Sequence, residues 1–149
     1  MTEPLGPVVQ ECVEGYLYAT PPLELLLFRR PPSRGRIWVP VSGKVDPEDR
    51  TFEAALTREL VEETGLTNPA SLEALDWHVR FRAENGDTWQ LHAYAVRVPR
   101  SFEPVLSPEH DAFEWVSLDE ALGRLHFEDN QAAVRRLAER LGRVPSSKV

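Results

Sequence analysis

Three glutamates crowd the end of a helix that the sequence predicts from Phe52 to Thr64. In such a helix Glu59 and Glu63 lie four residues apart on one face, and Glu62 lies on the adjacent row. Like charges at this spacing destabilise a helix by about 0.2–0.5 kcal/mol per pair, and the helix dipole disfavours anions in the last turn. A bound Mg²⁺ reverses this cost, because it prefers carboxylate oxygens as ligands. The segment therefore predicts a metal site, with a solvated acidic face as the alternative.

The composition fits one globular domain. The chain has 149 residues and a net charge of −7, which argues against a polymeric nucleic acid or a membrane surface as partner. No apolar run approaches the roughly 20 residues of a membrane span. The N-terminus lacks a secretory signal pattern and Cys12 is the only cysteine, so we expect a cytoplasmic protein without an intramolecular disulfide. We expect a single domain over residues 1–149, with a core over residues 8–141 and a loose tail over 143–149.

Alternating and continuous apolar runs predict both strands and helices. We expect strands over residues 8–18, 23–29, 37–41, 72–81, 89–98 and 113–116, and helices over residues 52–64, 118–125 and 128–141. A basic loop over residues 31–36 and a second loop over 43–49 precede the first helix. This order predicts an α+β fold in which a mixed, curved sheet is packed between helices.

The acidic run belongs to a longer motif. Its order is Arg58-Glu59-Leu60-Val61-Glu62-Glu63-Thr64-Gly65-Leu66, and Gly43 precedes it. This order resembles the signature of the Nudix hydrolases, in which a glycine and a glutamate precede Arg-Glu-aliphatic-x-Glu-Glu-x-Gly-aliphatic. The resemblance implies a Nudix-type α/β/α sandwich. It also implies hydrolysis of a phosphoanhydride bond with Mg²⁺ as cofactor and Mn²⁺ as the alternative metal.

The loop before the helix departs from the family pattern. The spacing from Gly43 to Arg58 is one residue longer than in the family, and the glutamate expected in this loop falls on Arg50. Glu48 and Asp49 are the nearby carboxylates that could take its place. The departure keeps open the alternative of a Nudix-fold nucleotide-binding module with impaired catalysis.

The resemblance implies a metal site and names its ligands. Glu59 and Glu63 correspond to the main carboxylate ligands, and the carbonyl of Gly43 would also face the metal. Glu109 precedes the last predicted core strand, where a related group of Nudix enzymes has a further metal ligand.

The same resemblance implies catalytic roles for Glu62, Glu63 and Arg58. Glu62 would be an accessory ligand or would orient a water molecule. The proton acceptor would be Glu62 or a carboxylate of the loop. Arg58 would pair with a motif carboxylate and hold the loop on the helix.

Two further segments resemble the bacterial Nudix enzymes that hydrolyse dATP and dihydroneopterin triphosphate. They are Trp38-x-x-Val41-Ser42-Gly43-x-Val45 and Phe127-x-x-Asn130-Gln131-Ala132. The resemblance favours a nucleoside or pterin triphosphate, cleaved to a monophosphate and pyrophosphate. The alternative substrate is a diadenosine polyphosphate, because the hydrolases of that class share a similar C-terminal segment.

Four residues outside the motif are candidates for substrate binding: Arg30, Trp38, Phe127 and Asn130. Arg30 could hold a phosphate through a forked, charge-assisted contact, and Trp38 could stack on a heterocycle. The alternatives are a solvated basic loop, a core tryptophan, and helix packing or capping for Phe127 and Asn130. The histidines show no metal-ligand spacing, and His110 is the one nearest the predicted site. We expect a small nucleotide-like partner, no polymeric nucleic acid or membrane, and a possible homodimer.

Overall fold

The computed structural model describes residues 4–142. Its strands are β1 (Val8–Ala19), β2 (Glu24–Arg29), β3 (Trp38–Val39), β4 (Val41–Lys44), β5 (Ser71–Arg82), β6 (Thr88–Arg97) and β7 (Ala112–Ser117). Its helices are α1 (Phe52–Thr64), α2 (Leu118–Arg124) and α3 (Glu128–Arg140), and a 3-10 turn, η1, spans Pro32–Arg34. None of the helices within residues 4–142 combines the length and apolar character needed to cross a membrane. The tail predicted over residues 143–149 lies outside the described residues.

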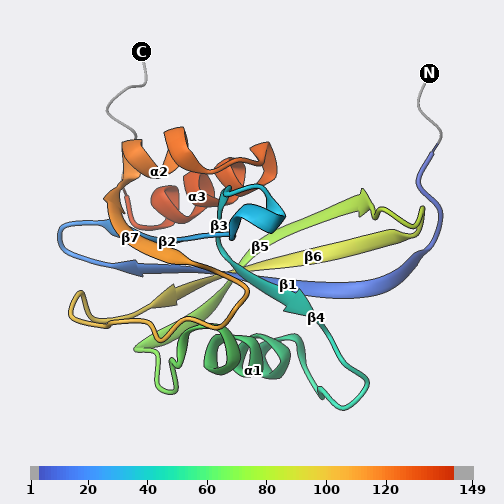
Figure 1. Ribbon diagram of the computed structural model, residues 1–149, viewed down its shortest axis with the longest axis horizontal. Helices are drawn as coiled ribbons and strands as arrows, with labels where there is room; N and C mark the ends of the chain where they lie inside the picture. The colour runs from blue at the N-terminus through green and yellow to red at the C-terminus, as the bar shows by residue number, and fades with distance from the viewer. Residues whose placement is uncertain (1–3, 143–149) are drawn as a thin grey trace.

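A single mixed sheet contains the seven strands of the described chain. Its main path runs β3-β2-β1-β6-β5, while β4 pairs with β1 and β7 pairs with β2. β1 and β6 are parallel, and the other pairs are antiparallel. Helix α1 covers one face of the sheet, and α2 and α3 cover the other (Figure 1). The predicted α/β/α sandwich is therefore confirmed.

Alternation along β1 sends its side chains into two separate cores. Val13 and Leu17 pack in a cluster with Leu56 of α1. Tyr16 packs in the other cluster, with Val134 of α3. Burial of each such side chain contributes about 1.5–3 kcal/mol. The core that contains Leu56 fixes α1 against β1 and against its neighbour β4.

Helix α1 has the predicted bounds, because both of its ends are specified locally. The Thr51 side chain accepts a hydrogen bond of 2.9 Å from the backbone N–H of Ala54, a cap that contributes about 1 kcal/mol. Gly65 has a φ of 77° and donates its N–H to the carbonyl of Val61. This left-handed conformation favours glycine. The helix therefore stops one residue after its glutamates.

The end of β4 differs from the sequence prediction. A loop was expected from Gly43 onward, but the strand continues to Lys44, with Gly43 opposite Val13 and Lys44 opposite Cys12 of β1. Pairing with the long strand β1 outweighs the weak strand preference of glycine. The continued strand brings the Gly43 backbone to the surface of α1.

Candidate active site

Helix α1 meets β4 at Gly43. A Cβ atom added to this glycine would lie 2.1 Å from both Cδ and Oε2 of Glu59. Real side chains do not approach so closely, so any larger residue would displace the Glu59 carboxylate. The glycine is required here for close packing rather than for an unusual φ. It brings one carboxylate directly against the end of the strand.

Arg58 ties the loop before α1 to the helix. Its Nη2 donates to Oδ2 of Asp49 at 2.8 Å and to the carbonyl of Lys44 at 3.0 Å. Its Nη1 donates to Oε2 of Glu59 at 3.1 Å. The hydrogen bond between Arg58 and Asp49 raises the pKa of the guanidinium and lowers the pKa of the carboxyl group. Arg58 therefore joins strand, loop and helix at one point.

Asp49 is the carboxylate of the loop before α1 that contacts Arg58 most closely. The residue that aligns with the glutamate of the family pattern, Arg50, is exposed, and so is Glu48. Asp49 has only 9% of its side chain exposed in its contact with Arg58. The longer loop thus places one carboxylate, that of Asp49, in an ion pair with Arg58.

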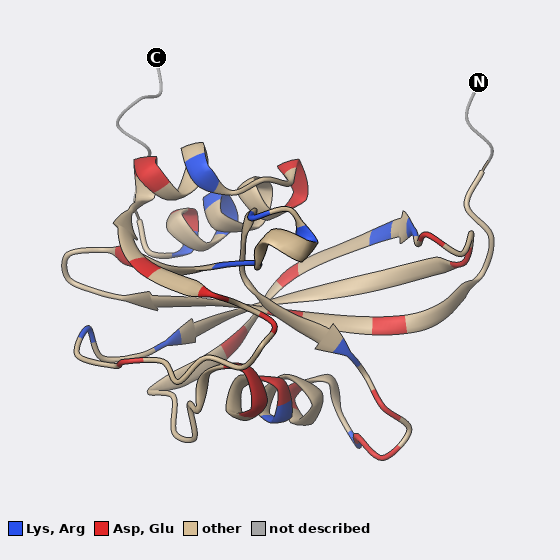
Figure 2. Ribbon diagram, in the orientation of Figure 1, with Lys and Arg blue, Asp and Glu red and all other residues tan. Residues whose placement is uncertain are grey.

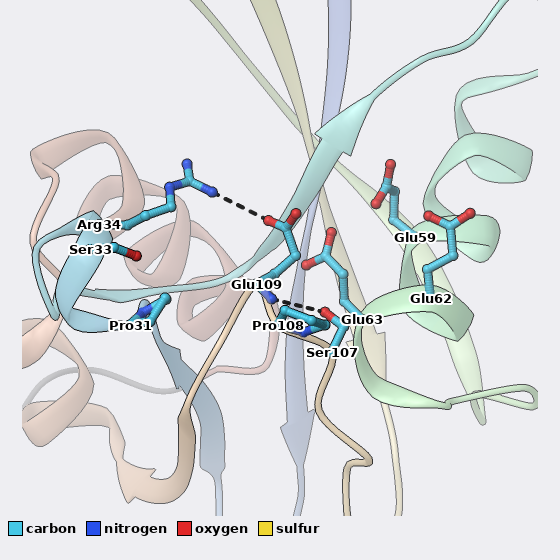
Figure 3. Close-up of a pocket in the computed structure, with 9 residues that line it drawn as sticks. All are labelled: Pro31, Ser33, Arg34, Glu59, Glu62, Glu63, Ser107, Pro108 and Glu109. Carbon is cyan, nitrogen blue, oxygen red and sulfur yellow. Dashed lines mark hydrogen bonds and ion pairs between the residues drawn. The ribbon is translucent and has the colours of Figure 1, made fainter.

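An open cleft of about 390 Å³ lies beside these residues. One wall comes from η1 and its flank, and the other from α1 and the loop before β7; the lining is Pro31, Ser33 and Arg34 against Glu59, Glu62, Glu63, Ser107, Pro108 and Glu109. Nη1 of Arg34 lies 3.4 Å from Oε1 of Glu109, so one ion pair spans the two walls (Figure 3). Acidic residues gather on α1 and on the loop that precedes it (Figure 2). The cleft therefore has an acidic wall opposite a cationic edge.

Glu63 is the buried carboxyl group of this cleft, with 4% of its surface exposed. Burial raises its pKa to about 9, and a hydrogen bond with Glu59 and the charges of Glu59 and Glu109 act in the same direction. A hydrogen bond from the backbone of Ser42 opposes the shift. Glu63 therefore keeps a proton at neutral pH when no cation is nearby.

The donor set fits a hard divalent cation. Within residues 4–142, no three His, Cys, Asp or Glu side chains are arranged to hold an ion by themselves. Mg²⁺, however, is commonly bound by one or two carboxylates together with water and substrate phosphates. The hydrogen-bonded pair Glu59 and Glu63 supplies such carboxylates, and Glu109 lies in the same cleft. A cation bound here would neutralise the Glu59 and Glu63 carboxylates in place of the proton on Glu63.

His110 lies close to Glu63. Its Nδ1 is 3.9 Å from Oε1 of Glu63 and has no hydrogen-bond partner among the described residues. Burial lowers the pKa of His110 to about 4, so the imidazole is neutral at pH 7. The sequence signal for this residue is its position next to Glu109.

The predicted substrate-binding residues fall into two groups. Arg30 lies close enough to Glu63 and Glu109 for their charges to act on its pKa, and its guanidinium is 5.9 Å from the ring centroid of Phe127. Trp38 forms the second group. Guanidinium groups of two other arginines lie over its ring, and the ring packs on the core. Asn130 is buried near the first group, with 4% of its surface exposed.

Glu14 is a residue that the sequence analysis missed. It is buried on β1, and its carboxylate accepts hydrogen bonds from Tyr16 and Asn130. The signal was present, because strand alternation puts this one acid on the same face as Cys12 and Tyr16. A charged residue on a buried strand face indicates a functional or structural requirement.

Comparison with known proteins extends this picture. A family model for the NUDIX domain matches residues 17–141. The chain is 33% identical over 100 residues to the asymmetrical bis(5'-nucleosyl)-tetraphosphatase of Rattus norvegicus, covering 66% of this chain and 67% of that protein. It is 40% identical over 119 residues to an octanoyltransferase of Myxococcus xanthus, covering 78% of this chain but only 32% of that protein. The solved structure of the E. coli dihydroneopterin triphosphate pyrophosphohydrolase superposes with a TM-score of 0.76 at 20% identity, covering 90% and 99% of the two chains.

Fold, motif and cleft together define an enzyme that hydrolyses phosphoanhydride bonds. The chain belongs to the Nudix family, and it is a Nudix pyrophosphohydrolase. Members of this family generally use divalent metal ions.

Proposed function

We propose that the substrate is a nucleoside triphosphate or a pterin triphosphate, hydrolysed to the monophosphate and pyrophosphate. The observation that carries this proposal is the cleft, in which the glutamates of α1 face Arg34 across a space of about 390 Å³. An acidic wall suits bound cations, and the cationic edge suits the phosphates that those cations would accompany.

The proposed metal is Mg²⁺, with Mn²⁺ as the alternative, and its ligands are Glu59, Glu63, Glu109 and the carbonyl of Gly43. When bound, the cation would neutralise developing charge on the phosphates and lower the pKa of a bound water. Glu59 approaches Gly43 closely, and Glu63 is buried beside Glu59, which supports these assignments.

The protein's own residues would then accept the proton of the attacking water and keep the carboxylates in place. The water oxygen would form a bond to one phosphorus of the α,β-phosphoanhydride and the bridging P–O bond would break, so that the monophosphate and pyrophosphate separate. Glu62, which is exposed in the cleft, is the proposed acceptor of the water proton. Arg58 does not touch the substrate in this scheme; it holds Asp49 and Glu59 in place.

Four residues are proposed to bind the substrate. Arg30 would contact a phosphate, because it lies between the acidic cleft and Phe127. Phe127 has 43% of its surface exposed and offers an aromatic face to a heterocycle. Asn130 would contribute polar atoms at the buried end. Trp38 would act as a stacking residue only if the two guanidinium groups over its ring move aside.

A second candidate substrate is a dinucleoside tetraphosphate. The likeness to the rat relative, a bis(5'-nucleosyl)-tetraphosphatase that is 33% identical to this chain, favours this substrate. Two further expectations, a cytoplasmic location and a homodimer, stay predictions. The loop with Arg50 had left open a module with impaired catalysis; the pair of Arg58 with Asp49 supports an intact motif instead.

Product analysis on a substrate panel tests the proposal. Purified protein with Mg²⁺ is incubated with dGTP, dATP, dihydroneopterin triphosphate and diadenosine tetraphosphate. We expect pyrophosphate release from a triphosphate, loss of activity with EDTA, and rising activity toward alkaline pH as Glu63 loses its proton. Release of a nucleoside triphosphate from diadenosine tetraphosphate alone would select the second candidate. Absence of hydrolysis across the panel would reject both.

A further inference from the structure

Two histidines from neighbouring strands face each other outside the cleft. His78 of β5 lies directly opposite His92 of β6, and their Nδ1 atoms are 2.8 Å apart. Neither residue lines the cleft. The two are 14 positions apart in sequence, so strand pairing rather than local spacing brings them together. They lie on the face of the sheet that α1 covers, because the ring of His92 stacks on Phe52 at the start of this helix.

His92 is held in one orientation by its neighbours. Its Nε2 lies 2.6 Å from Oε1 of Glu11 on β1, and the side chain of Gln90 donates to the same oxygen at 3.3 Å. The ring of Phe52 covers one face of the imidazole, with the two ring centroids 4.0 Å apart. These contacts leave Nδ1 as the ring nitrogen of His92 that is available to another partner.

The Glu11 carboxylate determines which nitrogen of His92 carries the proton. An ionised carboxylate only accepts hydrogen bonds, so Nε2 of His92 is the donor toward Glu11. A neutral imidazole has one N–H, so Nδ1 of His92 presents a lone pair and accepts from Nδ1 of His78. Histidines that bind metals commonly have this arrangement, because a carboxylate on the second nitrogen fixes the tautomer and makes the first nitrogen more basic.

His78 can offer a second lone pair at the same place. It lies at an exposed position, whereas His92 is buried. Loss of its Nδ1 proton and uptake of one from water at Nε2 leave the imidazole neutral, with Nδ1 free to bind. Two nitrogens in adjacent positions of a square-planar ion, each about 2.0 Å from it, are about 2.9 Å apart. The observed 2.8 Å is close to this separation, so rotation of the exposed ring is enough to direct both lone pairs at one ion.

The histidine pair is distinct from the carboxylates of α1. His92 is opposite Val13 in the β1–β6 ladder, and Val13 is opposite Gly43 in the β1–β4 ladder. Neighbouring strands are about 4.8 Å apart, so the backbones of His92 and Gly43 are about 10 Å apart. One ion therefore cannot be bound by the histidines and by Glu59, which packs on Gly43, at the same time.

We propose that His78 and His92 bind a divalent transition-metal ion such as Ni²⁺ or Cu²⁺. Imidazole is a preferred ligand of these ions, whereas Mg²⁺ prefers oxygen ligands. Within residues 4–142 no three His, Cys, Asp or Glu side chains are arranged around one ion, so water completes the coordination. Glu11 is a positioning residue, which acts through His92. The ion replaces the hydrogen bond between the two rings, and no group is oxidised or reduced. This site does not depend on the proposed function.

Calorimetry on untagged protein tests the site without relying on turnover. Ni²⁺ is titrated into the protein in excess Mg²⁺, which competes for the carboxylates of the cleft. Removal of a residue that only orients a ligand costs about 10- to 100-fold in metal affinity, so loss of a ligand in His78→Gln should weaken Ni²⁺ binding at least about tenfold. His126→Gln is the matched control, since His126 contacts Phe127 instead, and it should keep the wild-type affinity. No Ni²⁺ binding by the wild type, or equal affinity in His78→Gln, would overturn the proposal.

Glu11→Gln tests the positioning role of the carboxylate. The amide keeps the size of the side chain but not its charge, so Ni²⁺ affinity should fall about tenfold. Glu11→Asp keeps the charge and should recover part of this loss. Thermal melting in EDTA checks that both variants are folded. Equal Ni²⁺ affinity in folded Glu11→Gln and wild-type protein would overturn the role of Glu11.

Electron paramagnetic resonance of bound Cu²⁺ identifies the ligand atoms. We expect hyperfine splitting from two imidazole nitrogens in the wild type and from one in His78→Gln. A spectrum of Cu²⁺ bound only by oxygen would place the ion on carboxylates and overturn the histidine site.

Discussion

Glu63 on α1 and Glu14 on β1 are both 4% exposed, yet they have opposite surroundings. Burial is the main cause of the raised pKa in both, about 9 for Glu63 and about 7 for Glu14. Contact with Glu59 and the charge of Glu109 then raise the pKa of Glu63 further. For Glu14, the hydrogen bonds from Tyr16 and Asn130 lower the pKa, while the charge of Asp129 raises it. A hydrogen bond with a second carboxylate suits Glu63 to a cation, whereas Glu14 is held by neutral donors. Burial alone does not distinguish these two uses; the neighbours do.

The largest expected effect is on turnover, and it should come from Glu63. Glu63→Gln should lower kcat by about 10³-fold or more, because metal binding supplies several kcal/mol of transition-state stabilisation. The fold should persist, since the change removes a buried ionisable group. Product release with Mg²⁺ measures the effect, and Glu73→Gln at an exposed position of β5 is the control. Full activity in Glu63→Gln would remove this residue from the ligand set.

The pH dependence of stability gives the next largest effect. The pKa of Glu14 rises from 4.5 to about 7 on folding, so the folded state holds its proton more tightly than the unfolded state. The part of the stability that Glu14 contributes should therefore fall as pH rises from about 4.5 to about 7, and this part should level off above that. Glu14→Gln should remove up to about 3 kcal/mol of this fall. Urea unfolding across the pH range in EDTA measures it, and an unchanged slope in the variant would contradict the burial of an ionisable Glu14.

In the same experiment, saturating Mg²⁺ should separate the contributions of Glu63 and Glu14 to the pH dependence of stability. The fall in stability caused by Glu63, which extends to about pH 9 in the metal-free protein, should disappear because the cation stabilises the ionised form. The part caused by Glu14 should remain. Loss of both parts on addition of Mg²⁺ would place Glu14 in the metal site after all.

Gly43→Ala should disturb only the proposed metal site. A Cβ atom at this position would overlap the Glu59 carboxyl group, and overpacking of this kind costs about 1–3 kcal/mol. Calorimetry with Mn²⁺ should show weakened binding. Gly123→Ala is the matched control, since no atom lies within 4 Å of a Cβ added there. Unaltered Mn²⁺ affinity in Gly43→Ala would show that Glu59 can move without loss.

Asp49→Asn has the smallest expected effect. The amide keeps the shape but loses the charge that pairs with Arg58, and we expect a small loss in unfolding free energy. Glu48→Gln, at an exposed neighbouring position, should change nothing. Equal stability of the two variants would mean that the shifted loop carboxylate does not replace the missing glutamate.

The sequence predicted best those features that are specified by nearby residues. The bounds of α1 followed from apolar periodicity, Thr51 and Gly65, and the structure agrees with each. The continuation of β4 through Gly43 could not be predicted in this way, because it depends on pairing with β1. The helix could be located from a window of residues; the strand needed its partner.

The site shows the same division. The motif indicated the glutamates of α1, but alignment pointed to Arg50, and only the folded loop shows that Asp49 contacts Arg58. Glu14 was visible as one acid on a buried strand face. Its connection to Asn130 could not be predicted, since no local pattern links two residues from opposite ends of the chain.

That hydrogen bond has a consequence for the order of folding. Glu14 and Asn130 are 116 residues apart in sequence, and contacts of such long range form late, after the entropy of closing the intervening chain has been overcome. Helix α3 leaves the ribosome last among the described elements. A nascent chain can therefore complete the α1–β4 contact before α3 is available to Glu14. We expect the hydrogen bonds that join Asn130 to Glu14 and Tyr16 to be among the last contacts to form.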